Sequence, residues 1–168
     1  MPEASRSALD AWSSIPALVR GLVAGLSDAE LDRRTAGAPF SRRELVHHVV
    51  EANVVAASIV VAALGAAQPV YDWSWMMPFG PWMERMRYDR KPIGPALALL
   101  DAINAWIVSQ IEPLQDGLDR RIALRDRPGG ELRAATVGEI LLQEADHARE
   151  HSEELRGPGQ LGERGGGR

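Results

Sequence analysis

The chain has 168 residues and a formal net charge of −4. A chain of this length fits one domain, and it can bury about 70% of the surface that it would expose when unfolded. It contains no cysteine, which excludes a disulfide scaffold, a thiolate metal site and a cysteine nucleophile and fits a reducing cytoplasm. The mildly acidic balance, with Lys91 as the only lysine among scattered arginines, lacks the basic footprint of a nucleic-acid-binding protein.

Export and membrane signals are not expected in this sequence. Residues 1–6 lack the charged start and the following apolar stretch of a signal peptide. The longest mostly apolar run, 54–67, is shorter than the roughly 20 residues that cross a bilayer. We therefore expect a cytoplasmic protein with no membrane partner.

Helical periodicity dominates the first third of the chain. A first helix is predicted by a stripe of residues on one face: Leu9, Trp12, Pro16, Val19, Leu22, Val23 and Leu26. Ser27 and Glu30 match a capping box and predict a short helical turn. The same signature at Ser41 and Glu44 predicts a long second helix over about 42–65.

Two more long helices are expected further along the chain. A third apolar stripe runs from Ala96 to Ile111, and Pro113 interrupts it. A capping box at 136–139 predicts a last helix over about 137–156, which ends at Gly157.

The segments outside these helices are short. Residues 121–133 form either a small hairpin around Pro128-Gly129-Gly130 or a loop. The segment 157–168 holds six glycines and is expected to be a disordered tail. The predicted fold class is all-α, with a single four-helix bundle domain over 1–156.

The connection between the second and third helices has an unusual composition. Ten of the fourteen Trp, Met, Tyr and Phe residues lie between 71 and 88, where Pro78 and Pro81 interrupt any long helix. The segment is either a packed connection that covers one end of the bundle or the wall of a ligand pocket. In the second case the expected walls are Trp73, Trp75 and Trp82.

All four histidines of the chain lie in two of the predicted helices, at His47, His48, His147 and His151. His147 and His151 are four residues apart, so their side chains start about 6 Å apart on one helix face. Two imidazoles so placed can bind one metal ion. The alternative is a set of partly buried structural histidines, since a pair at this spacing also arises by chance.

Periodicity separates the two histidines of the second helix. His48 is expected to face the core, because steps of three and four residues lead from it to apolar side chains: Leu45, Ala52, Val55 and Ile59. His47 is expected at the edge, because the same steps lead to a more polar row: Glu44, Glu51, Val54 and Ser58.

Two segments resemble helix motifs of the DinB/YfiT-like superfamily. They are SRRELVHHVVEAN at 41–53 and TVGEILLQEADHAREH at 136–151. The His-x-Arg-x-His form at 147–151 is most similar to the YfiT-like branch of metal-dependent hydrolases and bacterial thiol transferases. The resemblance in helix order and crossover length extends over nearly the whole chain.

The resemblance implies an up-down-down-up bundle, often a homodimer, with a long crossover between helices two and three. It also implies a divalent metal ion, zinc or nickel, held by His48, His147 and His151. Some members activate mycothiol or bacillithiol, and others isomerise maleylpyruvate with mycothiol. This chain has Phe40 where the family often has Trp, and 152–154 depart from the family's Arg-Gly-Gln, which leaves the branch and the substrate open.

A metal ion on three neutral imidazoles can acidify either a water molecule or a thiol, so that both hydrolysis and thiol transfer are accessible. Glu144 and Glu51, each one turn from a predicted ligand, are the candidate catalytic residues. Each is a fourth ligand, an acceptor for an imidazole N–H, a general base, or a merely solvated carboxylate. Gln143 is a weaker candidate for a supporting role.

Two functions follow from these observations. The first is a metalloenzyme that transfers a low-molecular-weight thiol to a small electrophilic substrate, or hydrolyses that substrate. Thiol transfer ranks above hydrolysis because the resemblance points that way. The second is a non-catalytic protein that binds a small ligand or serves in a stress response.

Overall fold

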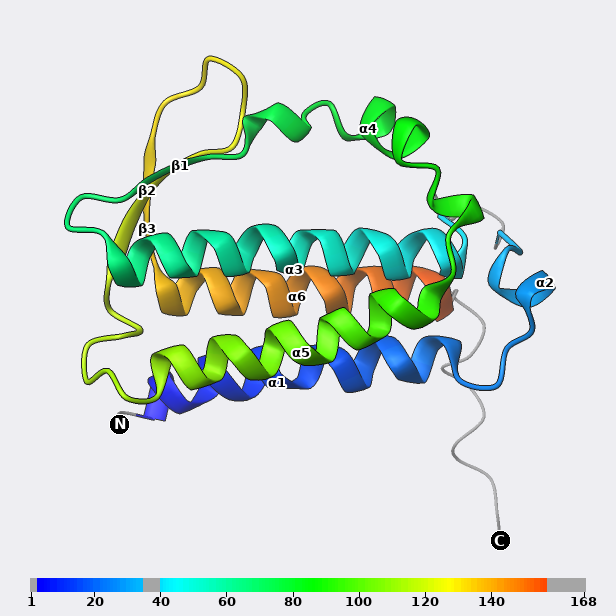
Figure 1. Cartoon of the computed structure of the whole chain (residues 1–168), viewed down its shortest axis with the longest axis horizontal. Helices are drawn as coiled ribbons and strands as arrows, with labels where there is room; N and C mark the ends of the chain where they lie inside the picture. Colours follow the sequence, from blue (N-terminus) through cyan, green and yellow to red (C-terminus); the bar gives the residue numbers. More distant parts are fainter. Residues whose placement is uncertain (1–2, 35–39, 157–168) are drawn as a thin grey trace, which may run out of the picture.

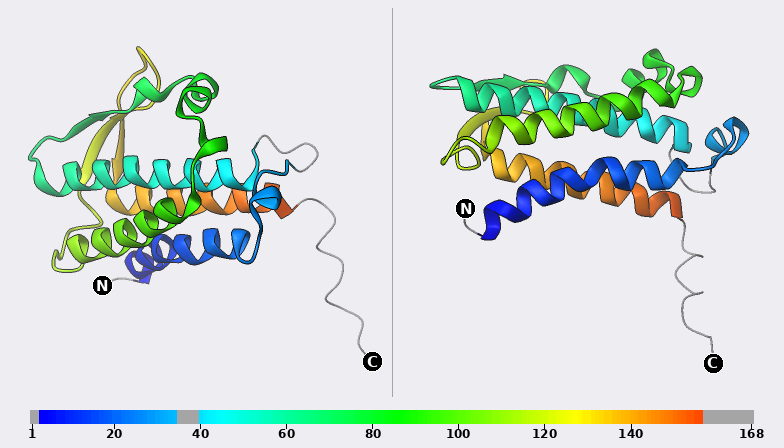
Figure 2. Two further views of the ribbon diagram at one scale, coloured as in Figure 1. Left: turned by 45° about the vertical axis from the view of Figure 1, so that its right-hand side comes forward. Right: turned by 60° about the horizontal axis from the view of Figure 1, so that its bottom comes forward.

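The computed structural model describes residues 3–34 and 40–156. Four long helices form the fold, and Figure 2 shows them running alongside one another. They are α1 (Glu3–Val23), α3 (Arg42–Gly65), α5 (Ile93–Ile111) and α6 (Val137–Arg156), with the single turn α2 (Asp28–Leu31) after α1. In Figure 1, α1 runs to the right, α3 and α5 run back to the left, and α6 returns to the right. The all-α, up-down-down-up bundle is therefore confirmed, whereas the predicted tail at 157–168 lies outside the described residues.

The predicted helix starts are made by capping boxes. In each, the side chain of a Glu accepts a hydrogen bond from the backbone N–H of a Ser or Thr three residues before it. The oxygen–nitrogen distances are 2.7–2.8 Å at three places: Ser27 with Glu30, Ser41 with Glu44, and Thr136 with Glu139. These local contacts explain why the bounds of α3 and α6 agree with the sequence prediction.

The connection between α3 and α5 is long because the two helices are parallel neighbours, so that the chain must return along the whole length of α3 before α5 begins. A helix of 24 residues is about 36 Å long. Residues 66–92, called the cover below, span that distance over α3 (Figure 1). The cover contains β1 (Val70–Asp72), the 3-10 turn Ser74–Met76, α4 (Phe79–Met86) and the 3-10 turn Tyr88–Arg90.

A three-stranded sheet ties the cover to the end of the bundle. β2 (Arg121–Arg125) pairs antiparallel with β3 (Arg133–Thr136). Of the two predicted alternatives for this segment, a hairpin or a loop, the structure thus has the hairpin. β1 pairs parallel with the outer edge of β2, with Val70 opposite Ala123. The sequence does not predict β1, since three residues carry no periodicity and the partner strand lies about 50 residues away.

The core lies between the four helices and includes one polar chain. Trp12 of α1 is fully buried, and its indole N–H donates to the backbone oxygen of Asn104 in α5 at 3.2 Å. The side chain of Asn104 in turn donates to the Oδ1 of Asn53 in α3 at 3.2 Å. These buried hydrogen bonds link three helices and fix their register.

By length and composition alone, α3 and α5 could each cross a membrane. In the bundle α3 is a core helix, and half of its most apolar stretch is buried, which accounts for its hydropathy. The corresponding stretch of α5 is less covered, and Leu99 and Trp106 are nearly half exposed.

Candidate metal centre

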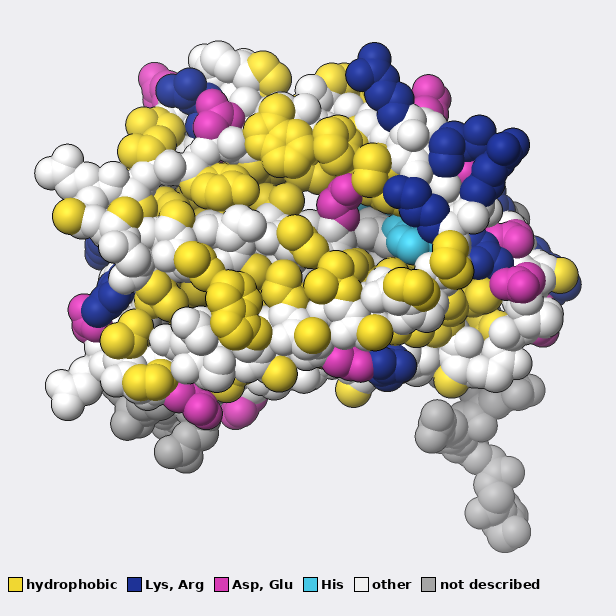
Figure 3. Space-filling view, viewed as in Figure 1, with side chains coloured by type: hydrophobic (Ala, Val, Ile, Leu, Met, Phe, Trp, Pro, Cys, Tyr) yellow, Lys and Arg dark blue, Asp and Glu magenta, His cyan; other side chains and the backbone are white. Residues whose placement is uncertain are grey.

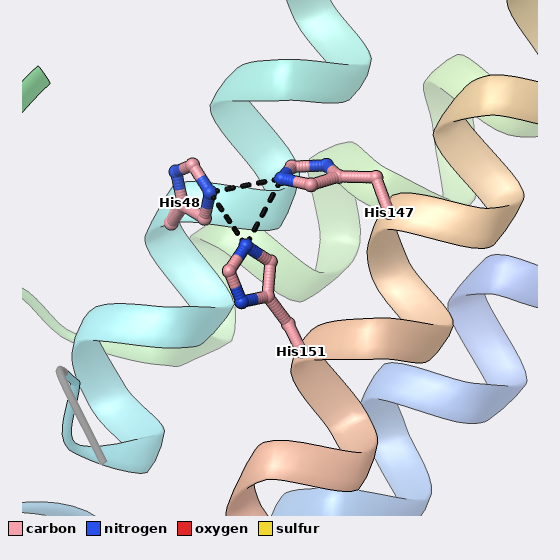
Figure 4. Close-up of side chains that lie close together, drawn as sticks. All are labelled: His48, His147 and His151. Carbon is pink, nitrogen blue, oxygen red and sulfur yellow. Dashed lines mark hydrogen bonds between the residues drawn. The ribbon is translucent and has the colours of Figure 1, made fainter. Parts of the chain in front are cut away.

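Three histidine side chains converge between α3 and α6 (Figure 4). The Nε2 atom of His48 lies 3.1 Å from the Nε2 atoms of both His147 and His151. The Nε2 atoms of His147 and His151 lie 3.0 Å apart. All three rings therefore direct the same nitrogen at one point.

The helices place these rings by simple geometry. His147 and His151 are successive members of one face of α6, because four residues make about one helical turn. His48 lies near the start of α3, and it meets the C-terminal half of α6 because the two helices are antiparallel (Figures 1 and 4). His47 points elsewhere, since its ring stacks on Tyr88 at 5.6 Å and its Nε2 lies 3.3 Å from the backbone oxygen of Lys91.

The nitrogen triangle fits a divalent cation. Its centre lies about 1.8 Å from each corner, slightly less than a zinc–imidazole bond of about 2.0–2.1 Å, so one ion can contact all three nitrogens. Without a cation the three Nε2 atoms cannot all be paired, because each carries either one proton or one lone pair. Burial, followed by the neighbouring His147 and His151, lowers the pKa of His48 to about 3. Its ring is therefore neutral at pH 7, as a metal ligand must be.

Carboxylates face the outer nitrogens of the two α6 histidines. The Nδ1 of His151 lies 2.9 Å from the Oε2 of Glu154. The Nδ1 of His147 lies 3.5 Å from the Oε2 of Glu144, and both atoms are buried without a hydrogen-bond partner among the described residues. Carboxylates so placed fix the tautomer and the orientation of metal-ligating imidazoles. Glu154 was not among the site residues predicted from the sequence, although its spacing of three residues from His151 was an available signal.

Phenylalanine rings pack around His48 instead. Phe79 of the cover meets the His48 ring edge-on at 4.5 Å between centroids, and Phe40 lies 5.5 Å from it. Phe40 also lies 5.7 Å from His151. Phe40 thus contacts two of the three converging histidines.

A cavity of about 650 Å³ lies beside the histidines, between α3, α6 and the cover. Figure 3 shows hydrophobic side chains gathered where the cover meets the bundle on the face in view. His48 and His147 line the cavity together with apolar side chains from three elements: Val55 and Ile59 of α3, Trp73, Met76, Met77 and Phe79 of the cover, and Ile140 of α6. Its volume is in the range of small-molecule sites.

The predicted pocket tryptophans occupy three different environments. Trp73 lines the cavity. Trp75 is 56% exposed and does not line it. Trp82 packs on Trp75 at 5.1 Å, and its indole N–H donates to Glu51.

The polar candidates Glu144, Gln143 and Glu51 also lie in different places relative to the cavity. Glu144 and Gln143 line the cavity, and Gln143 accepts a hydrogen bond from Arg133 at 3.4 Å. Glu51 does not line the cavity, and its carboxylate accepts hydrogen bonds from Trp82 and Tyr88 of the cover. The catalytic roles of Glu144 and Glu51 stay predictions.

Comparison with known proteins assigns the chain to a family. The chain belongs to the DinB superfamily, whose family model matches residues 11–155. No curated protein matches it in sequence.

Among solved structures, the fold is similar to that of YfiT from Bacillus subtilis. The TM-score is 0.73 with 18% sequence identity, over 93% of this chain and 86% of YfiT. YfiT is described as "a probable metal-dependent hydrolase with an unusual four-helix bundle topology". At this identity the likeness establishes the shared fold.

Proposed function

We propose that the protein is a metalloenzyme that acts on a small electrophilic substrate, with a divalent ion, zinc or nickel, held by His48, His147 and His151. The observation that carries the proposal is the convergence of three Nε2 atoms beside a largely apolar cavity. Three protein ligands with an open side are typical of catalytic rather than structural metal sites. The description of YfiT as a metal-dependent hydrolase supports the same class of activity.

The surrounding residues have definable tasks in this reaction. When bound, a divalent ion on neutral imidazoles acidifies a water molecule or a thiol so that either is a nucleophile near neutral pH. Glu154 accepts a hydrogen bond from the Nδ1–H of His151 and holds that ring in place, and Glu144 lies where it can do the same for His147. The apolar walls bind the body of the substrate and exclude bulk water from the reacting end.

Thiol transfer is the preferred reaction, with hydrolysis second. The chain has no cysteine, so a reacting thiol has to be a separate molecule, such as mycothiol or bacillithiol. The cavity of about 650 Å³ has room for a small thiol beside an electrophile.

The test is to load the protein with zinc or nickel and supply mycothiol, bacillithiol or a simple thiol together with a chromogenic electrophile. Thiol transfer predicts an acceleration that requires the metal and disappears in His151→Ala. Metal-dependent cleavage of esters or amides without thiol would move the assignment to hydrolysis. Bound metal with neither activity would favour the ligand-binding or stress-response function.

We also propose that the protein is a cytoplasmic homodimer. α5 has Asp101 as its only charged residue, yet Leu99 and Trp106 are 46% and 47% exposed. A helix that is apolar on all sides is normally covered, and a second copy offers the same uncharged face in return. Trp106→Arg is expected to convert a dimer into a monomer in analytical ultracentrifugation, and a monomeric unaltered protein would contradict the proposal.

A further inference from the structure

The α4 helix of the cover is attached to the bundle by very few contacts. None of its eight residues is buried, and Figure 1 shows it standing above the N-terminal half of α3. Within the part of the chain that the structure describes, the side-chain hydrogen bonds of α4 all come from Trp82. Apart from the packing of Phe79 on His48, the attachment of α4 therefore depends on what Trp82 contacts.

One carboxylate oxygen of α3 accepts hydrogen bonds from α4 and from the turn that follows it. The Oε2 of Glu51 accepts a hydrogen bond from the indole N–H of Trp82 at 2.7 Å and another from the hydroxyl of Tyr88. The Tyr88 side chain is buried against α3, where its ring stacks on His47. Glu51 thus binds α4 and the turn that follows it at a single point.

The environment of Glu51 makes these two hydrogen bonds strong. The side chain is half-buried, and this burial raises the pKa of its carboxyl group, whereas the Trp82 hydrogen bond and the charge of Lys91 oppose the rise. Hydrogen bonds to an ionised, partly desolvated carboxylate are stronger than those between neutral groups. Leaving such a group without its donors is correspondingly costly.

We propose that Glu51 is a positioning residue that fastens the cover over the metal centre through Trp82 and Tyr88. Phe79 begins α4 three residues before Trp82, packs against His48 and lines the cavity. Release of Trp82 would let α4 lift, withdraw Phe79 from His48 and open the cavity to water. Both donors to Glu51 belong to the cover, so it acts through other residues and does not touch the reacting atoms.

Limited proteolysis tests this inference without any assay of activity. Arg85 and Arg87 are exposed in and beside α4, and trypsin can cut there only when this segment opens. Glu51→Ala is expected to raise the rate of cleavage at these sites about tenfold or more, because two charge-assisted hydrogen bonds are lost. The metal content of the purified protein is expected to stay unchanged.

Matched variants separate the attachment from a general loss of stability. Tyr88→Phe keeps the ring, Trp82→Phe keeps a smaller aromatic ring, and each removes one donor, so each is expected to raise cleavage less than Glu51→Ala. Combined with Glu51→Ala, Trp82→Phe should add little, since both changes break the same contact. Glu84→Ala removes an exposed carboxylate from α4 itself and is expected to have no effect.

The catalytic consequence rests on the proposed function and is measured separately. With a substrate identified, Glu51→Ala is expected to raise KM severalfold while kcat changes less than about twofold, and Glu51→Gln should partly restore KM because it keeps an acceptor oxygen. Unchanged trypsin cleavage in both Glu51→Ala and Tyr88→Phe would overturn the inference. A large fall in kcat in Glu51→Ala, with the rate of trypsin cleavage unchanged, would instead make Glu51 a catalytic group. An unaltered protein that contains no metal ion would contradict the proposed function. The trypsin cleavage rates would still test whether Glu51 fastens the cover.

Discussion

The four long helices bury Trp12, Leu100 and Leu141 completely, whereas α4 of the cover buries none of its eight residues. The helices supply the converging histidines and the two carboxylates behind them. The cover supplies the aromatic and methionine side chains that close the cavity. In the proposed function the bundle alone supplies the metal ligands, while the cover shares the walls of the substrate cavity with α3 and α6.

The largest expected effect comes from the ligands in the bundle. The double change His147→Ala and His151→Ala is expected to reduce bound metal to background while circular dichroism still shows a folded helical protein. Two of three ligands are lost, but neither ring supports the core. His47→Ala is the matched control and should keep one metal ion per chain, because His47 contacts Tyr88 and Lys91 rather than the other histidines.

Trp12→Ala probes the bundle away from the metal centre. Truncation of a fully buried Trp is expected to reduce the free energy of unfolding by about 3–5 kcal/mol, measured by urea denaturation. Metal content at low temperature, where the protein stays folded, should be unchanged. A loss of metal from the folded variant would show that metal binding depends on the packing of the core around Trp12.

An intermediate effect is expected from the carboxylates behind the ligands. Glu154→Gln should weaken metal affinity about 10–100-fold, measured by competition with a chromophoric chelator. Glu153→Gln removes the neighbouring exposed carboxylate and should leave the affinity unchanged. Equal affinities for these two variants would contradict a role for Glu154 in orienting His151.

The smallest effect is expected from a single wall of the cover. Trp73→Ala should weaken binding of an apolar ligand severalfold and leave metal content intact, because Trp73 lines the cavity and its indole ring is not a metal ligand. Binding is followed by quenching of intrinsic fluorescence. Trp75→Ala, which removes an exposed ring outside the cavity, should bind the ligand as the unaltered protein does.

The sequence was most informative where structure is decided locally. Capping boxes at Ser41 and Thr136 fix helix starts through contacts within four residues, so the bounds of α3 and α6 could be predicted. Helical periodicity likewise separated His48 from His47, and the structure directs His48 alone of the two at α6.

The features that sequence could not supply depend on contacts between distant residues. The partners of Glu51 lie 31 and 37 residues away, in a segment without regular periodicity. β1 exists only because the edge of β2 is available to it. Trp75 and Trp82 lie in the same aromatic run as Trp73, and only the path of the cover decides that Trp73 lines the cavity.

X-ray absorption spectroscopy on the zinc- or nickel-loaded protein tests the central claim most directly. A centre built by His48, His147 and His151 predicts one ion per chain with imidazole scattering from three rings at about 2.0–2.1 Å, and loss of this signal in the double histidine variant. A first shell of oxygen ligands alone, or an imidazole signal that survives in that variant, would contradict the account.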